Sequence, residues 1–162
     1  MSNARNLANL LGTSTTIPSG KVVSASLPTG TILQVKQGED NTEVLHTTGT
    51  WADTNLSVSI TPISTSSDIL ILINQSCYRT GSGGGALRIM RDSTAVFQDS
   101  QVYQCFGNEA SNRLFHNMQY LDSPSTTSAI TYKTQGIEHS GDFRTNQGGF
   151  FYSRITVMEI AG

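Results

Sequence analysis

The sequence predicts an all-β protein, an antiparallel β-sandwich of jelly-roll-like form. Residues 56–61 (LSVSIT) alternate apolar and polar side chains, which is typical of a strand with one buried and one wet face. Residues 69–73 (ILILI) are apolar without interruption, which indicates a central strand covered on both faces. Short apolar segments then recur about every 8–12 residues between turn-forming residues, as in sandwiches and jelly rolls.

The remaining strands are expected where β-branched and aromatic residues cluster. These segments are 32–36, 43–50, 86–91, 95–99, 113–121, 129–138 and 150–160. Gly, Asp, Ser and Pro mark the connections between them. We expect a mobile loop at 81–85 (GSGGG), a hairpin turn at 92–94 (DST), a loop at 107–112, a turn at 122–128 and a long polar loop at 139–149.

The last predicted strand is apolar on both of its alternating faces. In 155–160 (ITVMEI), Ile155 and Val157 lie on one face, and Met158 and Ile160 lie on the other. The strand is therefore expected either at the centre of a sheet or buried between subunits, and Val157 is a candidate assembly residue.

The N-terminus predicts a separate docking segment. Leu7, Leu10 and Leu11 follow i, i+3, i+4 spacing in a short amphipathic helix, and a small, polar linker follows it at 13–20. Because so short a helix is marginal in water, its leucine stripe needs a surface to cover it. We therefore divide the chain into a docking helix and linker at 1–20 and a β-sandwich domain at 21–162, which begins with an extended arm at 21–28.

Charge and hydrophobicity exclude several classes of partner. The 162-residue chain has a formal net charge of −2 and no basic block, so we expect no nucleic-acid binding. No segment approaches the roughly 20 apolar residues of a membrane span, so we expect no membrane insertion. A secretory signal pattern is also absent, which predicts folding in the cytoplasm.

The residues that carry catalysis or metal binding show no organised pattern. His46, His116 and His139 are widely spaced, and the carboxylates stand singly, mostly at turns. We therefore expect no metal site, no cofactor and no enzymatic activity. Cys77 and Cys105 match no metal or redox spacing and are expected to be reduced, half-buried thiols in strands; whether they pair stays open.

One set of residues fits a carbohydrate-binding patch. Trp51 lies at a strand end, Tyr103 precedes a loop, and Phe143 and Arg144 lie in the polar segment 139–149. An aromatic ring covers the C–H face of a sugar while neighbouring polar groups bind its hydroxyls. These four residues are candidate glycan contacts, although core or interface packing is the ordinary role of strand aromatics.

Several motifs together resemble a known family. They are the opening at 4–12 (ARNLANLLG), 56–62 (LSVSITP), 91–95 (RDSTA), 121–128 (LDSPSTTS) and 155–162 (ITVMEIAG). The chain resembles small virion structural proteins of tailed bacteriophages, often labelled tail fibre proteins and frequent in phages of aquatic bacteria. The resemblance extends over nearly the whole chain, and the segments 78–86 and 101–113 fit it least.

The resemblance implies a jelly-roll-like sandwich, assembled as a homotrimer and attached to other virion proteins of the capsid or tail through residues 1–20. It implies a fibre, spike or decoration module that is assembled in the host cytoplasm, and it implies no catalytic residues. The alternative is a receptor-recognition module of a tail fibre that binds a host surface glycan.

Overall fold

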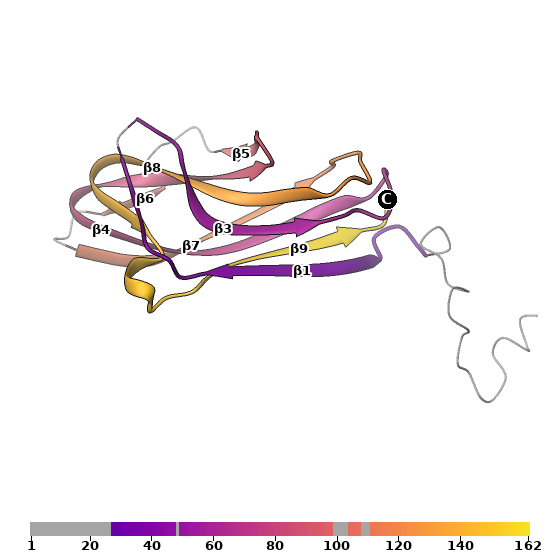
Figure 1. Cartoon of the computed structure of the whole chain (residues 1–162), viewed down its shortest axis with the longest axis horizontal. Coiled ribbons are helices and arrows are strands. Elements are labelled where there is room, and N and C mark those ends of the chain that lie inside the picture. Colours follow the sequence, from indigo (N-terminus) through magenta and orange to yellow (C-terminus); the bar gives the residue numbers. More distant parts are fainter. Residues whose placement is uncertain (1–26, 48, 99–103, 108–110) are drawn as a thin grey trace, which may run out of the picture.

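The computed structural model describes residues 27–47, 49–98, 104–107 and 111–162. Within these residues, nine strands form one antiparallel hydrogen-bonded sheet, which confirms the all-β antiparallel prediction (Figure 1). The elements are β1 (Ile32–Asp40), β2 (Val44–His46), β3 (Ala52–Ile60), β4 (Asp68–Arg91), β5 (Thr94–Gln98), β6 (Cys105–Gly107), β7 (Ser111–Asp122), β8 (Ile130–Thr145), the 3₁₀ turn η2 (Gln147–Gly149) and β9 (Ser153–Ile160). The expected docking helix and linker at 1–20, with Leu7, Leu10 and Leu11, lie outside the described residues, as does most of the arm at 21–28.

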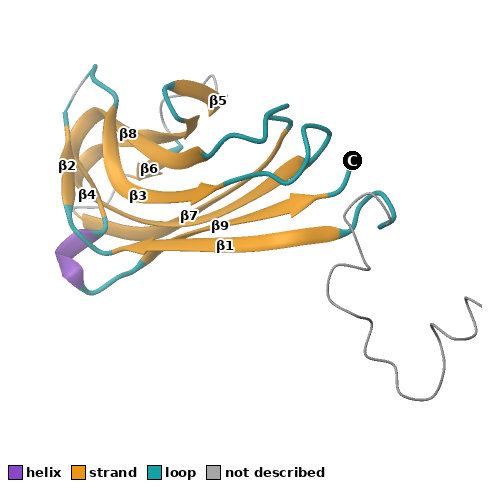
Figure 2. Ribbon diagram, turned by 45° about the vertical axis from the view of Figure 1, so that its right-hand side comes forward, coloured by secondary structure: helices purple, strands orange, loops and turns teal. Residues whose placement is uncertain are grey.

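The single sheet folds over on itself into two layers. One layer has the order β1-β9-β4-β7 and uses the first half of β4, from Asp68 to Thr80. The other layer pairs β3 with β8, β8 with the second half of β4, and that half of β4 with β5. The end of β8 continues past the bend and pairs with β4 from Cys77 to Thr80. Figure 2 shows β8 and β5 on one side of the fold and β1 and β9 on the other. Strand β4 therefore belongs to both layers.

The glycine-rich segment at 81–85 is part of β4, so the prediction of a loop there is wrong. The pairing of β4 with β8 shifts register between Thr80 and Gly85, where the strand turns from one layer into the other. A Cβ atom at Gly85 would overlap the carbonyl oxygen of Ile137 and the ring of Phe143. The close approach of β4 to β8 thus requires glycine at this point. A glycine-rich composition is the same in a flexible loop and in a closely packed strand, so the sequence alone does not separate the two.

Other strand boundaries differ from the prediction in both directions. Strand β8 runs on to Thr145, through most of the polar loop expected at 139–149. The strand expected at 43–50 is only the three residues of β2, and β9 starts at Ser153 rather than at 150. The hairpin at 92–94 is confirmed, with Arg91 paired to Thr94 across a turn in which Asp92 has φ 50°. No helix among the described residues is long and apolar enough to span a bilayer.

The apolar core lies between the two layers. Strand β3 alternates buried and exposed residues as its sequence predicts, and its buried side chains face the inward side chains of β4 and β9. Val157 is fully buried at the centre of this core, between strands β1 and β4, so it is a sheet-centre residue. The buried apolar cluster consists of Leu56, Val58, Ile60, Ile69, Ile71, Ile73, Cys77, Leu87, Ile89, Cys105, Met118, Ile130, Tyr132, Phe143, Ile155 and Val157.

A buried polar cluster closes the end of the sandwich next to η2. Asn146 is fully buried with left-handed backbone angles (φ 58°, ψ 41°), and its Nδ2 donates to the Asp40 carboxylate at 3.0 Å and to the Thr54 carbonyl at 2.9 Å. Its Oδ1 accepts from Gln75 Nε2 at 2.8 Å and from the Ser153 hydroxyl. One side chain thereby joins β1, β3, β4 and β9. Because buried polar atoms are costly when unpaired, this cluster fixes how these strand ends meet.

Asn146→Ala should lower the free energy of unfolding by about 3 kcal/mol, because it leaves Gln75, Ser153 and Asp40 without a shared partner and puts a Cβ-bearing residue without a hydrogen-bonding side chain in the left-handed region. Asn146→Gly removes the same hydrogen bonds but suits the backbone, so it should cost roughly 1 kcal/mol less. Urea denaturation followed by circular dichroism measures both values.

The control for this prediction is Asn41→Ala. Asn41 lies nearby and donates one solvent-accessible hydrogen bond, to the carbonyl of Gly149 at 2.9 Å, so its loss should cost at most about 0.5 kcal/mol. Equal destabilisation by Asn41→Ala and Asn146→Ala would contradict the importance of the cluster.

Candidate interaction surface

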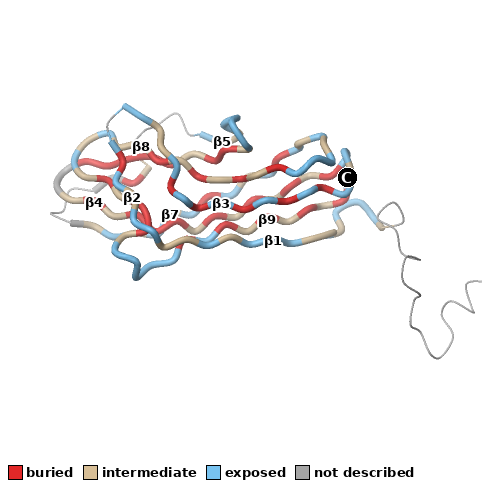
Figure 3. The backbone as a smooth tube through the Cα atoms, viewed as in Figure 1, coloured by how far each residue is buried: buried red, intermediate tan, exposed pale blue. Residues whose placement is uncertain are grey.

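The outward face of the layer β1-β9-β4-β7 carries a row of apolar side chains that the fold leaves uncovered. Val35, Met158, Leu70 and Leu121 are direct cross-strand neighbours, one from each strand. Val35 and Leu121 are each 51% exposed, and Leu70 and Met158 are half-buried. Figure 3 shows this pattern as buried residues alternating with half-buried and exposed ones along the strands. We call these four residues the apolar row.

Ile32 and Ile160 extend the apolar row on its β1 side. They pair with each other at the start of β1, and Ile32 is 55% exposed. The described chain begins close to this point, because the turn at 28–31 is held to the end of β9 by hydrogen bonds between Gly30 and Ala161 (2.7 Å) and between Ala161 and Thr31 (2.9 Å). Figure 1 places the C-terminus at the same end of the sandwich.

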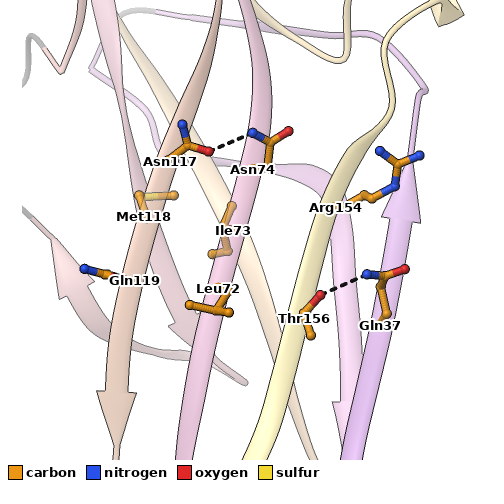
Figure 4. Close-up of a pocket in the computed structure, with 9 residues that line it drawn as sticks. All are labelled: Gln37, Leu72, Ile73, Asn74, Asn117, Met118, Gln119, Arg154 and Thr156. Atoms are coloured by element: carbon orange, nitrogen blue, oxygen red, sulfur yellow. Dashed lines mark hydrogen bonds between the residues drawn. The ribbon is translucent and has the colours of Figure 1, made fainter.

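Next to the apolar row lies an open groove lined mainly by amide side chains. Asn74 Nδ2 donates to Asn117 Oδ1 at 2.7 Å, and Gln37 Nε2 donates to the Thr156 hydroxyl at 3.0 Å (Figure 4). The groove has a volume of about 550 Å³. Its lining residues are Gln37, Leu72, Ile73, Asn74, Asn117, Met118, Gln119, Arg154 and Thr156.

Charged side chains on this part of the face are few: Asp68 pairs with Ile160 in the strand register, and Arg154 and Glu39 form one exposed pair. The Arg154 guanidinium lies 3.5 Å from Glu39, and both side chains are about half exposed, so the pair adds little to stability. The face therefore presents apolar area and uncharged hydrogen-bonding groups. Such a combination suits contact with another protein surface, because amides form hydrogen bonds across an interface without the desolvation cost of unpaired charges.

Aromatic side chains gather beyond the groove, at the η2 end of the same face. Phe115 of β7 meets Phe151 edge to face, with ring centroids 6.1 Å apart, and the Arg113 guanidinium lies 5.1 Å from the centre of the Tyr78 ring. Phe150 is 84% exposed. Exposed rings beside an arginine are common at protein interfaces, so this end extends the uncovered surface.

The predicted glycan contacts that the structure describes, Trp51, Phe143 and Arg144, do not form one patch. The ring of Phe143 is fully buried in the core, 5.5 Å from the ring of His46, because β8 continues through this segment and turns Phe143 inward over Gly85. The prediction that Phe143 faces solvent is therefore wrong. Tyr103 lies outside the described residues.

Trp51 and Arg144 lie at the surface but are engaged within the chain. The Arg88 guanidinium covers the Trp51 ring at 4.5 Å, and Arg88 also donates to Gln135. Arg144 forms ion pairs with Asp142 and Glu43, and its hydrogen bonds to these two carboxylates raise the pKa of Arg144 further above its ordinary value. Both side chains are thus held in place by partners within the same molecule.

Metal binding finds no support in the described part of the chain. There, no three His, Cys, Asp or Glu side chains come together in a group that could hold a metal ion. His46 and His116 lie on different strands, β2 and β7, and each has its own polar partners within the chain.

The apolar run at 69–73 is the sequence signal for the apolar row, but its prediction as a strand covered on both faces is wrong. The uninterrupted run at 69–73 predicted a strand covered on both faces, but the second layer covers only the face of Ile69, Ile71 and Ile73. Leu70, on the other face, remains half-buried. The groove amides carried no such signal, because Asn and Gln on strands are ordinary surface residues and their gathering depends on register.

Comparison with known proteins finds similarity to solved structures. No family model matches the chain, and no curated protein matches it. A chain in the structure of the Gt strain of infectious bursal disease virus is similar over 80% of this chain and 38% of its own length, with 14% sequence identity and a TM-score of 0.36. The similarity concerns the strand arrangement alone.

His46 gives the fold a defined response to pH. Its ring is buried against Phe143 and its Nε2 lies 3.0 Å from the Thr145 hydroxyl. Burial lowers the pKa of His46 from 6.5 to about 4, against a smaller opposing effect of a backbone hydrogen bond at Gly136. Between pH 6.5 and about pH 4, His46 therefore binds a proton in the unfolded chain but not in the folded chain.

We expect the free energy of unfolding to fall by about 3 kcal/mol in total as the pH is lowered from 6.5 to about 4, through the titration of His46. Above pH 6.5 this group is neutral in both states and contributes no pH dependence. Denaturant titrations of the wild type and of His46→Gln at several pH values measure the effect, and the variant should lack this component. Parallel pH profiles for the two proteins would contradict it.

Proposed function

We propose that this chain is a structural protein of a bacteriophage virion, a homotrimeric fibre, spike or decoration module. In this proposal, residues 1–20 anchor the module to another virion protein, and the β-sandwich is displayed outward. The assignment to a bacteriophage virion is supported by the sequence motifs that resemble small tail-fibre-like proteins. The assembly is supported by the uncovered face described above.

The single observation that carries the proposal is the apolar row. A monomer exposes isolated apolar side chains as a matter of course, but here they are aligned across four strands and continue into Ile32 and Ile160. Each such side chain contributes about 1 to 2 kcal/mol when it leaves water. The row is therefore a surface that gains from being covered.

A second copy of this chain is the occupant we propose. The face is poor in charge, so identical copies meet without repulsion, and its amides offer both donors and acceptors to an identical partner. Self-association would also bury Leu70, Met158 and Ile160 on the outward faces of β4 and β9, which are half-buried in the isolated chain. The trimeric number comes from the family resemblance.

The position of the first described residues supports the role of residues 1–20. The turn at 28–31 is fixed beside Ile32, so the described part of the chain begins at the end of the apolar row. Leu7, Leu10 and Leu11 could then pack among the leaders of neighbouring subunits or on a virion protein. In both arrangements, the leucine stripe is covered by assembly.

The double substitution Val35→Lys and Leu121→Lys should convert the trimer into a folded monomer. Burying two charges in place of two apolar side chains removes at least about 3 kcal/mol of association free energy, which raises the dissociation constant by at least about a hundredfold. Light scattering coupled to size-exclusion chromatography measures the mass, and circular dichroism confirms the fold.

Leu45→Lys is the matched control for this substitution. Leu45 is 53% exposed but lies on β2, outside the layer that carries the apolar row, so the trimer should persist. A wild-type chain that is monomeric at micromolar concentration would overturn the proposed assembly. If that monomer also bound a surface polysaccharide of the host on a glycan array, the receptor-recognition alternative would replace it.

Deletion of residues 2–20 should leave a folded sandwich that no longer joins the particle, because the deletion removes the leucine stripe without touching the described strands. Quantitative mass spectrometry of purified virions, with the full-length chain as the reference, measures its copy number. Replacing Leu7, Leu10 and Leu11 together by Ser should have the same effect. Incorporation of the deleted chain at full occupancy would refute the anchoring role.

A further inference from the structure

The two cysteines, distant in the sequence, are brought together by the fold. Cys77 lies on the first half of β4 and faces the core, and Cys105 lies on β6, which pairs with β4 beyond the bend through Gly85. Both thiols are free and almost completely buried, rather than half-buried as the sequence suggested. Their side chains form a hydrogen bond with each other.

A histidine completes this cluster and makes the two thiols unequal. His116 of β7 is the cross-strand neighbour of Gln75, two positions from Cys77 on the same face, and its side chain forms a hydrogen bond with Cys105. The hydrogen bond with Cys77, opposed by burial and reinforced by His116, lowers the pKa of Cys105 to about 6. Burial raises the pKa of Cys77. Because His116 acts on Cys105 and favours its thiolate, we assign Cys105 as the attacking thiol and Cys77 as the thiol that follows.

We propose that Cys77 and Cys105 are a redox-active pair that closes to an intramolecular disulfide when the chain meets a peroxide. The Cys105 thiolate attacks one oxygen of hydrogen peroxide, the O–O bond breaks, and the products are a Cys105 sulfenic acid and hydroxide, which takes up the displaced thiol proton as water. The sulfur of Cys77 then attacks the sulfenic sulfur, the S–S bond forms, and a second water leaves. Two thiols are oxidised and one peroxide is reduced to two waters.

The surrounding strands fit this chemistry. Because the two thiols already interact within one buried cluster, the second step joins neighbouring side chains. Access to Cys105 requires only local opening of β6, which is held to β4 by three register pairs. The disulfide would tie β6 to the first half of β4 across the bend, and it would constrain the unfolded chain between residues 77 and 105.

The test treats the purified full-length chain with hydrogen peroxide, then denatures it and labels any remaining thiols with an alkylating reagent. Intact mass should show the loss of two hydrogen atoms and no label, and peptide mapping should show a link between Cys77 and Cys105 within one chain. The melting temperature should rise by a few degrees and return to its starting value after reduction. Full alkylation of both thiols after treatment, or a link only between two chains, would overturn the proposal.

Single variants assign the order of attack. In Cys77→Ser, oxidation should stop at a Cys105 sulfenic acid, which dimedone traps. In Cys105→Ser, Cys77 should stay reduced under the same conditions. His116→Gln should slow disulfide formation several-fold without preventing it, because Cys105 loses one of the groups that favour its thiolate. Equal reactivity of Cys77 and Cys105 in the two serine variants would refute the assigned roles. None of these readouts depends on virion assembly, so the test of the redox-active pair is independent of the test of the proposed function.

Discussion

The fold depends on one strand that serves two layers. Strand β4 pairs with β9 and β7 before its bend, with β5 after it and with β8 on both sides of it, so the antiparallel sheet is continuous through the segment around Gly83 and Gly85. At Gly85 the backbone passes so close to Phe143 and the Ile137 carbonyl that no side chain fits. The core between the layers exists because this strand turns there, and the placement of both cysteines follows from the same turn.

Buried polar residues fix the two ends of the sandwich. At the η2 end, Asn146 binds groups from four strands. At the opposite end, the buried carboxylate of Glu159 accepts from Gln34 Nε2 at 2.6 Å and from the backbone N–H of Ile63 at 2.7 Å, and these hydrogen bonds, working against burial, lower the pKa of Glu159. An apolar core sets the layers face to face but tolerates sliding. The two polar clusters specify the register of the strand ends.

The sequence predicted what depends on local periodicity and missed what depends on close approach. The alternation in β3, the hairpin at 92–94 and the strand at 113–121 were predictable because each follows from neighbouring residues alone. The continuation of β4 through 81–85 and of β8 to Thr145 was not, because polar and glycine-rich segments read as loops unless their cross-strand partners are known. The burial of Phe143 was not predicted either, because the face on which a strand residue lies depends on the register of that strand.

The apolar residues on the outward face of the layer β1-β9-β4-β7 are not explained by the fold of a single chain. The outward faces of β4 and β9 carry apolar residues at Leu70, Met158 and Ile160, but the two-layered sheet covers only the inward face of each strand. The side chains left over are aligned by the register into the apolar row, beside amides that satisfy one another in pairs. A sequence selected only for a monomer would place polar residues at Leu70, Leu121 and Met158 at little cost to the core. Contacts beyond the single chain would explain their apolar character, and the self-association that we propose would supply those contacts.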